Sequence, residues 1–167
     1  MHKKRWISLL VENDVGVLAN ISGLFSGKSY NLDSLTAGTT TDRTISRMTI
    51  SLTSDDQTFE QIKKQLNRNV DIIKVTDFTD TAIHMKELMY LKIIGLKESE
   101  MGKVERVSEV FGVKMIDYGV DSVLLECVQT EKRNSDLVEL CVKLFGNRVD
   151  IVRGGSVAIE AISISER

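Results

Sequence analysis

The chain has 167 residues, of which 42% are hydrophobic and 28% charged, with 22 basic and 24 acidic side chains. This composition predicts a soluble globular protein of one domain or two small ones, and it excludes an intrinsically disordered chain. The formal net charge of -2 and the absence of an apolar run of roughly 20 residues favour neither a nucleic-acid partner nor a membrane partner.

The first half of the chain alternates short apolar runs with amphipathic segments. In chain order it predicts a strand at 5–12, a helix from Val17, strands at 31–40 and 45–53, a helix through 59–66 and a strand at 70–78. The stretch SDDQ before the second helix indicates a capping box between Ser54 and Gln57. The predicted order is therefore β-α-β-β-α-β.

The second half repeats this order. It predicts a strand at 85–95, a helix through 104–111, strands at 113–120 and 122–129, a helix that Gly146 ends, and a last strand from Val149. The stretch VDIVR at 149–153 nearly repeats VDIIK at 70–74. We therefore predict an α+β fold of two tandem ferredoxin-like domains, 1–79 and 80–167, with a hinge in TDTA at 79–82.

Residues that carry catalytic or metal chemistry are sparse. Cys127 and Cys141 lie among apolar residues without metal-ligand spacing, which predicts buried free thiols and fits a reducing cytoplasm. The two histidines, His2 and His84, have no evident catalytic partner. The stretch GGSVA at 154–158 lacks the second glycine of a nucleophile elbow. We expect no catalytic residue and no metal site.

Aromatic residues make up only 5% of the chain, although RNA-recognition domains share the predicted element order. Those domains stack bases on aromatic side chains of an exposed sheet. Here the phenylalanines at 25, 59, 111 and 145 all fall at core positions of predicted helices. RNA recognition is therefore disfavoured.

The turn SGKS after the first helix resembles the end of a nucleotide-binding loop. However, Gly23 precedes Gly27 by too few residues, and the turn follows a helix, where carbonyl groups repel phosphate. We interpret Gly27 as a C-cap glycine and Lys28 as a complement to the helix dipole.

The stretch NDVGVL before the same helix is the better candidate for a binding site. Asn13 or Asp14 can cap the helix, and Gly16 permits close approach of the backbone. The unpaired N–H groups of a helix start suit a carboxylate. The same residues also fit an ordinary strand-to-helix turn, and because most helices have such a start, the residues alone favour that interpretation.

The blocks LLVENDVGVLANISGLFSGKSYNLDSLT, ISRMTI and QIKKQLNRNVDIIKV follow one another within residues 5–78. They carry the patterns E-N-x-x-G-x-L, G-L-F-x-x-x-x-Y-N-[IL]-[DE]-S-L-T and S-R-M-T-I in order. This part of the chain resembles the regulatory small subunits of acetolactate synthase, also called acetohydroxyacid synthase, and residues 85–167 suit the same family. The resemblance implies that the first domain is an ACT domain, a module that binds amino-acid effectors.

The resemblance further implies a regulatory subunit without an active site. Such subunits bind a separate catalytic large subunit, which carries thiamine diphosphate, Mg²⁺ and FAD and begins the synthesis of valine, leucine and isoleucine. They raise its activity and confer feedback inhibition, usually by valine. We therefore expect no cofactor in this chain, a homodimer through the ACT domains and a complex with the large subunit. The alternative is a stand-alone amino-acid-binding ACT regulator of another enzyme or of a transcription system.

In the family the effector lies between two ACT domains, where the helix-start loop of one chain meets the second strand of the other. Carried onto this sequence, the predicted effector site consists of Asn13, Asp14, Val15, Gly16, Val17 and Leu18 from the loop and of Asn31 and Leu32 from the facing strand. Backbone N–H groups would hold the carboxylate of valine, the side chains of Asn13 and Asn31 its ammonium group, and aliphatic residues its side chain.

Overall fold

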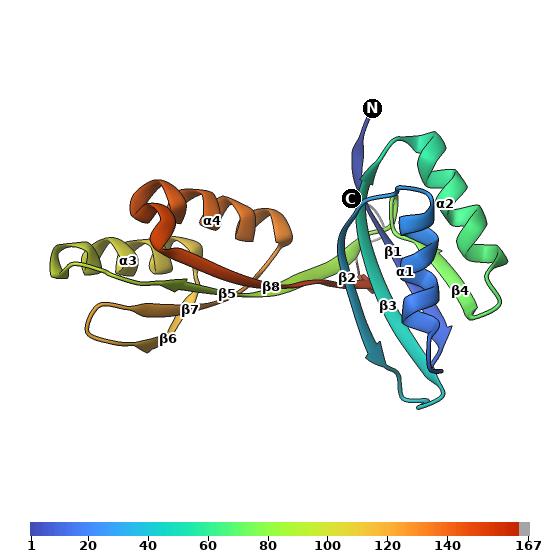
Figure 1. The fold of residues 1–167 in the computed structure, drawn as a ribbon, viewed down its shortest axis with the longest axis horizontal. Coiled ribbons are helices and arrows are strands. Elements are labelled where there is room, and N and C mark those ends of the chain that lie inside the picture. The colour runs from blue at the N-terminus through green and yellow to red at the C-terminus, as the bar shows by residue number, and fades with distance from the viewer. Residues whose placement is uncertain (164–167) are drawn as a thin grey trace. The chain divides into compact units, whose positions relative to one another are not determined.

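The computed structural model describes residues 1–163 and contains two compact units, each with a four-stranded sheet and α-helices (Figure 1). Of the described residues, the first unit comprises Met1–His84 together with residues 156–163, and the second comprises Met85–Gly155. The element order confirms the predicted α+β fold with two β-α-β-β-α-β repeats. The predicted domain boundary between residues 79 and 80 stays a prediction.

The first unit is an antiparallel sheet whose strands follow the order β2-β3-β1-β4. Its elements are β1 (Lys3–Glu12), α1 (Val17–Gly27), β2 (Leu32–Thr39), β3 (Ile45–Ser54), α2 (Asp56–Arg68) and β4 (Ile72–Asp77). Strands β1 and β3 pair in continuous register from Lys3 opposite Ser54 to Glu12 opposite Ile45. Strands β2 and β4 are consequently the two edges of the sheet.

The core of the first unit follows from the alternation of its strands. Every second residue of β1, from Ile7 through Leu9 to Val11, is buried against the helices. The other buried hydrophobic residues of this core are Val17, Ile21, Phe25, Met48, Ile50, Leu52, Phe59, Ile62 and Leu66. Helices α1 and α2 therefore cover one face of the sheet, and the opposite face lies outside this core.

The second unit has the strand order β6-β7-β5-β8. Its elements are β5 (Ile83–Ile93), α3 (Glu98–Phe111), β6 (Lys114–Tyr118), β7 (Val123–Gln129), α4 (Glu131–Phe145), the 3-10 helix η1 (Gly146–Arg148) and β8 (Val149–Glu160). Its core contains Met89, Leu91, Ile93, Leu96, Val104, Val107, Val123, Leu125, Cys127, Leu137, Cys141 and Phe145. None of the helices within residues 1–163 has the length and hydropathy needed to cross a membrane.

Two helix ends differ from the predictions. The N-cap of α2 is Asp55, whose carboxylate accepts a hydrogen bond from the Thr58 N–H at 2.8 Å, so the predicted capping box at Ser54 is wrong. Helix α1 ends at Gly27, but the left-handed residue after it is Ser29, with φ of 57°. The prediction of a C-cap glycine is therefore wrong, because Ser29 makes the turn that leads into β2.

Candidate functional site

Two backbone hydrogen bonds hold the point where β1 runs into the loop before α1. The Glu12 N–H donates to the Asp71 carbonyl at 2.9 Å, and the Asn13 N–H donates to the Thr44 carbonyl at 2.8 Å. Thr44 belongs to the turn between β2 and β3, and Asp71 directly precedes β4. The loop is thus anchored on both sides before it reaches the helix.

The side chain of Asn13 strengthens this anchor. Its Nδ2 donates to the Arg43 carbonyl at 2.8 Å, and its Oδ1 accepts from the Ser46 hydroxyl at 2.9 Å. In the same turn the Asp42 carboxylate accepts from the Thr44 hydroxyl and N–H, which lowers the pKa of Asp42. Asn13 therefore braces the loop, and its predicted contact with an effector stays a prediction.

Gly16 is the N-cap residue of α1, with φ of 88°, in the left-handed region. No side chain caps the helix, so the predicted capping by Asn13 or Asp14 is wrong. An added Cβ at this position would meet nothing within 4 Å. The backbone conformation, rather than a lack of space, is what favours glycine here.

The start of α1 presents backbone donors that the rest of the chain does not use. In the described part of the chain, the N–H groups of Gly16, Leu18 and Ala19 have no acceptor, and that of Val17 reaches the Asp14 carbonyl at 3.4 Å. These groups lie at the positive end of the helix dipole. The arrangement is chemically suited to an anion of the size of a carboxylate.

Apolar side chains flank these donors. Val15 is fully exposed and Leu18 is 53% exposed, whereas Val17 is buried in the core. Beside them the Asn20 amide donates to the Asp71 carboxylate at 2.5 Å. The loop thus offers donors for a carboxylate next to an aliphatic surface that this unit leaves uncovered.

The second part of the predicted site, Asn31 and Leu32, lies beyond the other end of α1. The helix has 11 residues, which corresponds to a length of about 16 Å. Asn31 borders a surface cavity of about 220 Å³ together with Tyr30 and Asp55. One chain therefore does not bring the two parts of the predicted site together, and joining them requires a second chain.

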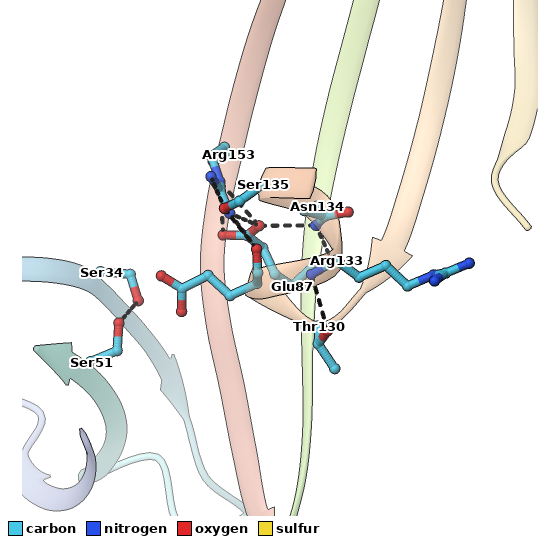
Figure 2. A network of polar contacts seen from close by, with 9 residues as sticks. Ser34, Ser51, Glu87, Thr130, Arg133, Asn134, Ser135 and Arg153 are labelled. Atoms are coloured by element: carbon cyan, nitrogen blue, oxygen red, sulfur yellow. Dashed lines mark hydrogen bonds and ion pairs between the residues drawn. The ribbon is translucent and has the colours of Figure 1, made fainter. Parts of the chain in front are cut away.

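The second unit contains a buried polar cluster that the sequence did not predict (Figure 2). Glu87 of β5 is 2% exposed, and its carboxylate accepts from Arg153 of β8 at 2.9 Å and from the Asn134 amide at 2.9 Å. Arg153 also donates to the Ser135 hydroxyl and to the Glu131 carbonyl of α4. The cluster ties two strands to one helix, with a guanidinium beside the buried carboxylate.

A signal for this cluster was present in the strand pattern. Glu87 has the same parity in β5 as Met89, Leu91 and Ile93, which are buried in the core. A charged residue at an inward position of a strand requires a partner. The identity of that partner depends on the later return of β8, which the local pattern does not reveal.

Cys127 and Cys141 are buried free thiols, as predicted. Burial raises the pKa of each thiol to about 11, so both stay protonated at neutral pH and are poor nucleophiles. Within residues 1–163 no group of three or more histidine, cysteine, aspartate and glutamate side chains is placed to hold a metal ion.

Comparison with known proteins finds matches along both units. A family model described as an AHAS small subunit-like ACT domain matches residues 7–74, and one described as the small subunit of acetolactate synthase matches residues 86–162. The acetolactate synthase small subunit of Aquifex aeolicus is 37% identical over 165 residues, which cover 98% of this chain and 85% of that protein. The acetolactate synthase isozyme 3 small subunit of Escherichia coli is 34% identical, with 93% and 94% covered.

The fold has a solved counterpart as well. The crystal structure of the acetolactate synthase small subunit from Thermotoga maritima matches with a TM-score of 0.82 and 25% identity, covering 97% of this chain and 99% of that one. The first matched region includes the loop before α1, and the second includes the cluster around Glu87.

Proposed function

Because the chain belongs to the family of acetolactate synthase small subunits, we propose that it binds the catalytic large subunit, raises its activity and makes it sensitive to feedback inhibition by valine. In this proposal thiamine diphosphate, Mg²⁺ and FAD belong to the large subunit. The present chain acts through binding alone, as a regulatory subunit.

The start of α1 is the observation that carries the proposal. The N–H groups of Gly16 and Leu18 are free of acceptors within the described residues, in a loop that Asn13 braces. They would bind the carboxylate of valine, and the exposed side chains of Val15 and Leu18 would contact its isopropyl group. One short segment thus provides both hydrogen-bond donors and an apolar surface for valine.

The edge position of β2 supports a site shared by two chains. The end of β2 lies near the loop, because Thr39 pairs with Ser46, whose hydroxyl binds Asn13. If the β2 strands of two copies pair in antiparallel fashion, the start of one strand meets the end of the other. Asn31 and Leu32 of the second copy would then approach the loop of the first, which joins the two parts of the predicted site.

In this mechanism valine bridges two ACT domains and changes their relative orientation or rigidity. The dimer then holds the large subunit in a less active arrangement. Coupling between effector and partner of this kind typically amounts to about 1–3 kcal/mol and is reciprocal for binding. Activation without valine uses other surfaces of the chain.

Substitution of Gly16 by aspartate tests the effector site. The new carboxylate would occupy the donors at the start of α1 and repel the carboxylate of valine. We expect the valine concentration for half-inhibition of the reconstituted enzyme to rise at least tenfold, while activation by the small subunit is retained. The measurement is acetolactate formation by large subunit plus variant, with and without valine.

Gly23→Asp is the matched control, because Gly23 lies in the middle of the same helix and an added Cβ there meets nothing within 4 Å. It should leave inhibition unchanged, and thermal melts of both variants separate a folding defect from a sensing defect. Full valine sensitivity of Gly16→Asp would refute the site. Failure of the chain to co-purify with the large subunit would instead refute the regulatory proposal as a whole.

A further inference from the structure

A cavity lies on the face of the first sheet that is opposite α1 and α2. Residues 156–163 belong to the first unit, and the Thr36 hydroxyl of β2 donates to the Ser156 carbonyl at 3.1 Å. Next to this contact is a cavity of about 290 Å³. It is lined by Thr36, Ala37, Gly38, Thr39, Arg47, Thr49, Val157, Ala158 and Ile159.

Two polar side chains of the lining, those of Arg47 and Thr49, offer donors that lack acceptors within residues 1–163, whereas the Thr36 hydroxyl is already bonded to the Ser156 carbonyl. Within residues 1–163 the exposed guanidinium of Arg47 has no ion-pair or hydrogen-bond partner. Thr49 is 4% exposed, and in the same range its hydroxyl has no hydrogen bond either. No lining residue carries a carboxylate or a carboxamide. A buried hydroxyl beside an unpaired guanidinium therefore faces the cavity without an internal acceptor.

The remaining lining is small or aliphatic. Val157 and Ile159 are each more than half exposed. Gly38 pairs with Arg47 across β2 and β3, so the space beside the guanidinium on the neighbouring strand holds no side chain. An added Cβ at Gly38 would meet nothing within 4 Å. The cavity thus combines an apolar wall with an open approach to Arg47.

We propose that this cavity binds a small aliphatic carboxylate that has no ammonium group, such as a branched fatty acid or 2-oxo acid. Arg47 pairs with the carboxylate, Thr49 donates a hydrogen bond to it, and Val157 and Ile159 contact the hydrocarbon. A free amino acid fits less well, because no lining side chain is an anionic or amide acceptor for its ammonium group. The site is separate from the loop before α1 and does not depend on the proposed effector binding there.

Titration of the full chain with isovalerate tests the proposal, followed by backbone amide NMR and by calorimetry. We expect saturable shifts confined to residues 36–39, 47–49 and 157–159. Parallel titrations use 3-methylbutan-1-ol, which lacks the carboxylate, inorganic phosphate, which lacks the hydrocarbon, and valine. Each should bind this cavity at least tenfold more weakly than isovalerate does. Equal occupancy by phosphate, or by valine at these same residues, would overturn the assignment of ligand class.

Two variants test the roles of individual residues. Arg47→Met should weaken isovalerate binding about tenfold or more, the effect of losing one charge-assisted hydrogen bond. Arg68→Met is the matched control, because Arg68 is exposed on α2, and it should bind as the unmodified chain does. Gly38→Val fills the cavity without removing Arg47 and should also abolish binding. The proposal fails if isovalerate gives no saturable shifts or if Arg47→Met binds normally.

Discussion

The carboxylate of Glu87 illustrates, at the scale of single residues, how this chain tolerates a buried charge. Two side chains, Arg153 and Asn134, donate to it, while Arg153 keeps 30% of its own side-chain surface in solvent. The cost of desolvating the carboxylate is offset by these bonds only while the guanidinium is present. Removing one partner should therefore harm the second unit more than removing both.

Arg153→Met should lower the free energy of unfolding of the second unit by about 3 kcal/mol, because it leaves the Glu87 carboxylate buried beside an apolar side chain. The measurement is urea unfolding followed by hydrogen exchange of the β5 amides.

The double variant Glu87→Met with Arg153→Met should lose less stability than the single variant. Lys143→Met, which removes an exposed ion pair with Glu139 on α4, should give no resolvable change. A double variant that is as unstable as Arg153→Met would contradict this explanation.

At the scale of elements, one acidic side chain fixes the start of α3. The Glu100 carboxylate accepts from the Lys97 N–H at 2.9 Å and from both terminal nitrogens of Arg148, at 2.9 and 2.8 Å. Arg148 lies in η1, so this carboxylate joins two helices that are distant in the sequence. The hydrogen bond from Arg148 is the largest cause that lowers the pKa of Glu100 to about 2.

This pKa predicts a pH dependence of stability. The folded pKa lies below the ordinary value of 4.5, so the stabilisation is complete above about pH 5 and is lost as the pH falls towards 2. Glu100→Gln should unfold more easily than the unmodified chain at pH 7, and the difference should shrink between about pH 4.5 and 2. Urea midpoints measured across this range provide the check.

Glu98→Gln in the same helical turn is the control, because within residues 1–163 Glu98 forms no ion pair. The change in urea midpoint between pH 7 and pH 3 should be the same for Glu98→Gln as for the unmodified chain. If the difference in urea midpoint between Glu100→Gln and the unmodified chain were the same at pH 7 and pH 2, the bond to Arg148 would contribute nothing to folding.

The elements were predictable where their signal is periodic, and their ends were not. Alternation of apolar residues locates β1 and β5, but it does not reveal that Asn13 is engaged by the turn at 43–46, so its expected capping role was wrong. The loop before α1 became the predicted effector site through the resemblance and not through the residues alone. The cavity at Arg47 was missed, because it depends on a segment more than a hundred residues away in the sequence.

At the scale of the whole molecule, the first unit is built from two separate pieces of chain. Residues 156–163 join Met1–His84, and the Ala161 N–H donates to the Ala82 carbonyl at 2.9 Å. Ser156 is fully buried, and Ala158 is 8% exposed. Two consecutive repeats in the sequence do not indicate this return, since the hinge predicted at 79–82 accounts only for the passage of the chain from the first repeat to the second.

Ala158→Asp should therefore destabilise the first unit, although the residue follows the second unit in the sequence. A carboxylate at this position, which is 8% exposed, would have to be desolvated, and the exposed Arg47 that lines the same cavity would offset only part of that cost, so the free energy of unfolding should fall by roughly 2 kcal/mol. Hydrogen exchange should show faster exchange in β2 and β3 than in β6 and β7. Ile162→Asp, at a fully exposed position, should leave both units unchanged. Equal effects of the two substitutions would argue against a role of the returning segment.

The discontinuous first unit has a consequence for synthesis on the ribosome. Residues 1–84 emerge first, yet the segment from Ser156 that completes their unit is translated only after the whole of residues 85–155. A nascent chain must hold the incomplete sheet, with its polar face around Thr49 uncovered, until that last segment emerges. Chains whose synthesis stops before Ser156 would thus expose the incomplete sheet of the first unit, and proteases that act on unfinished proteins would recognise it.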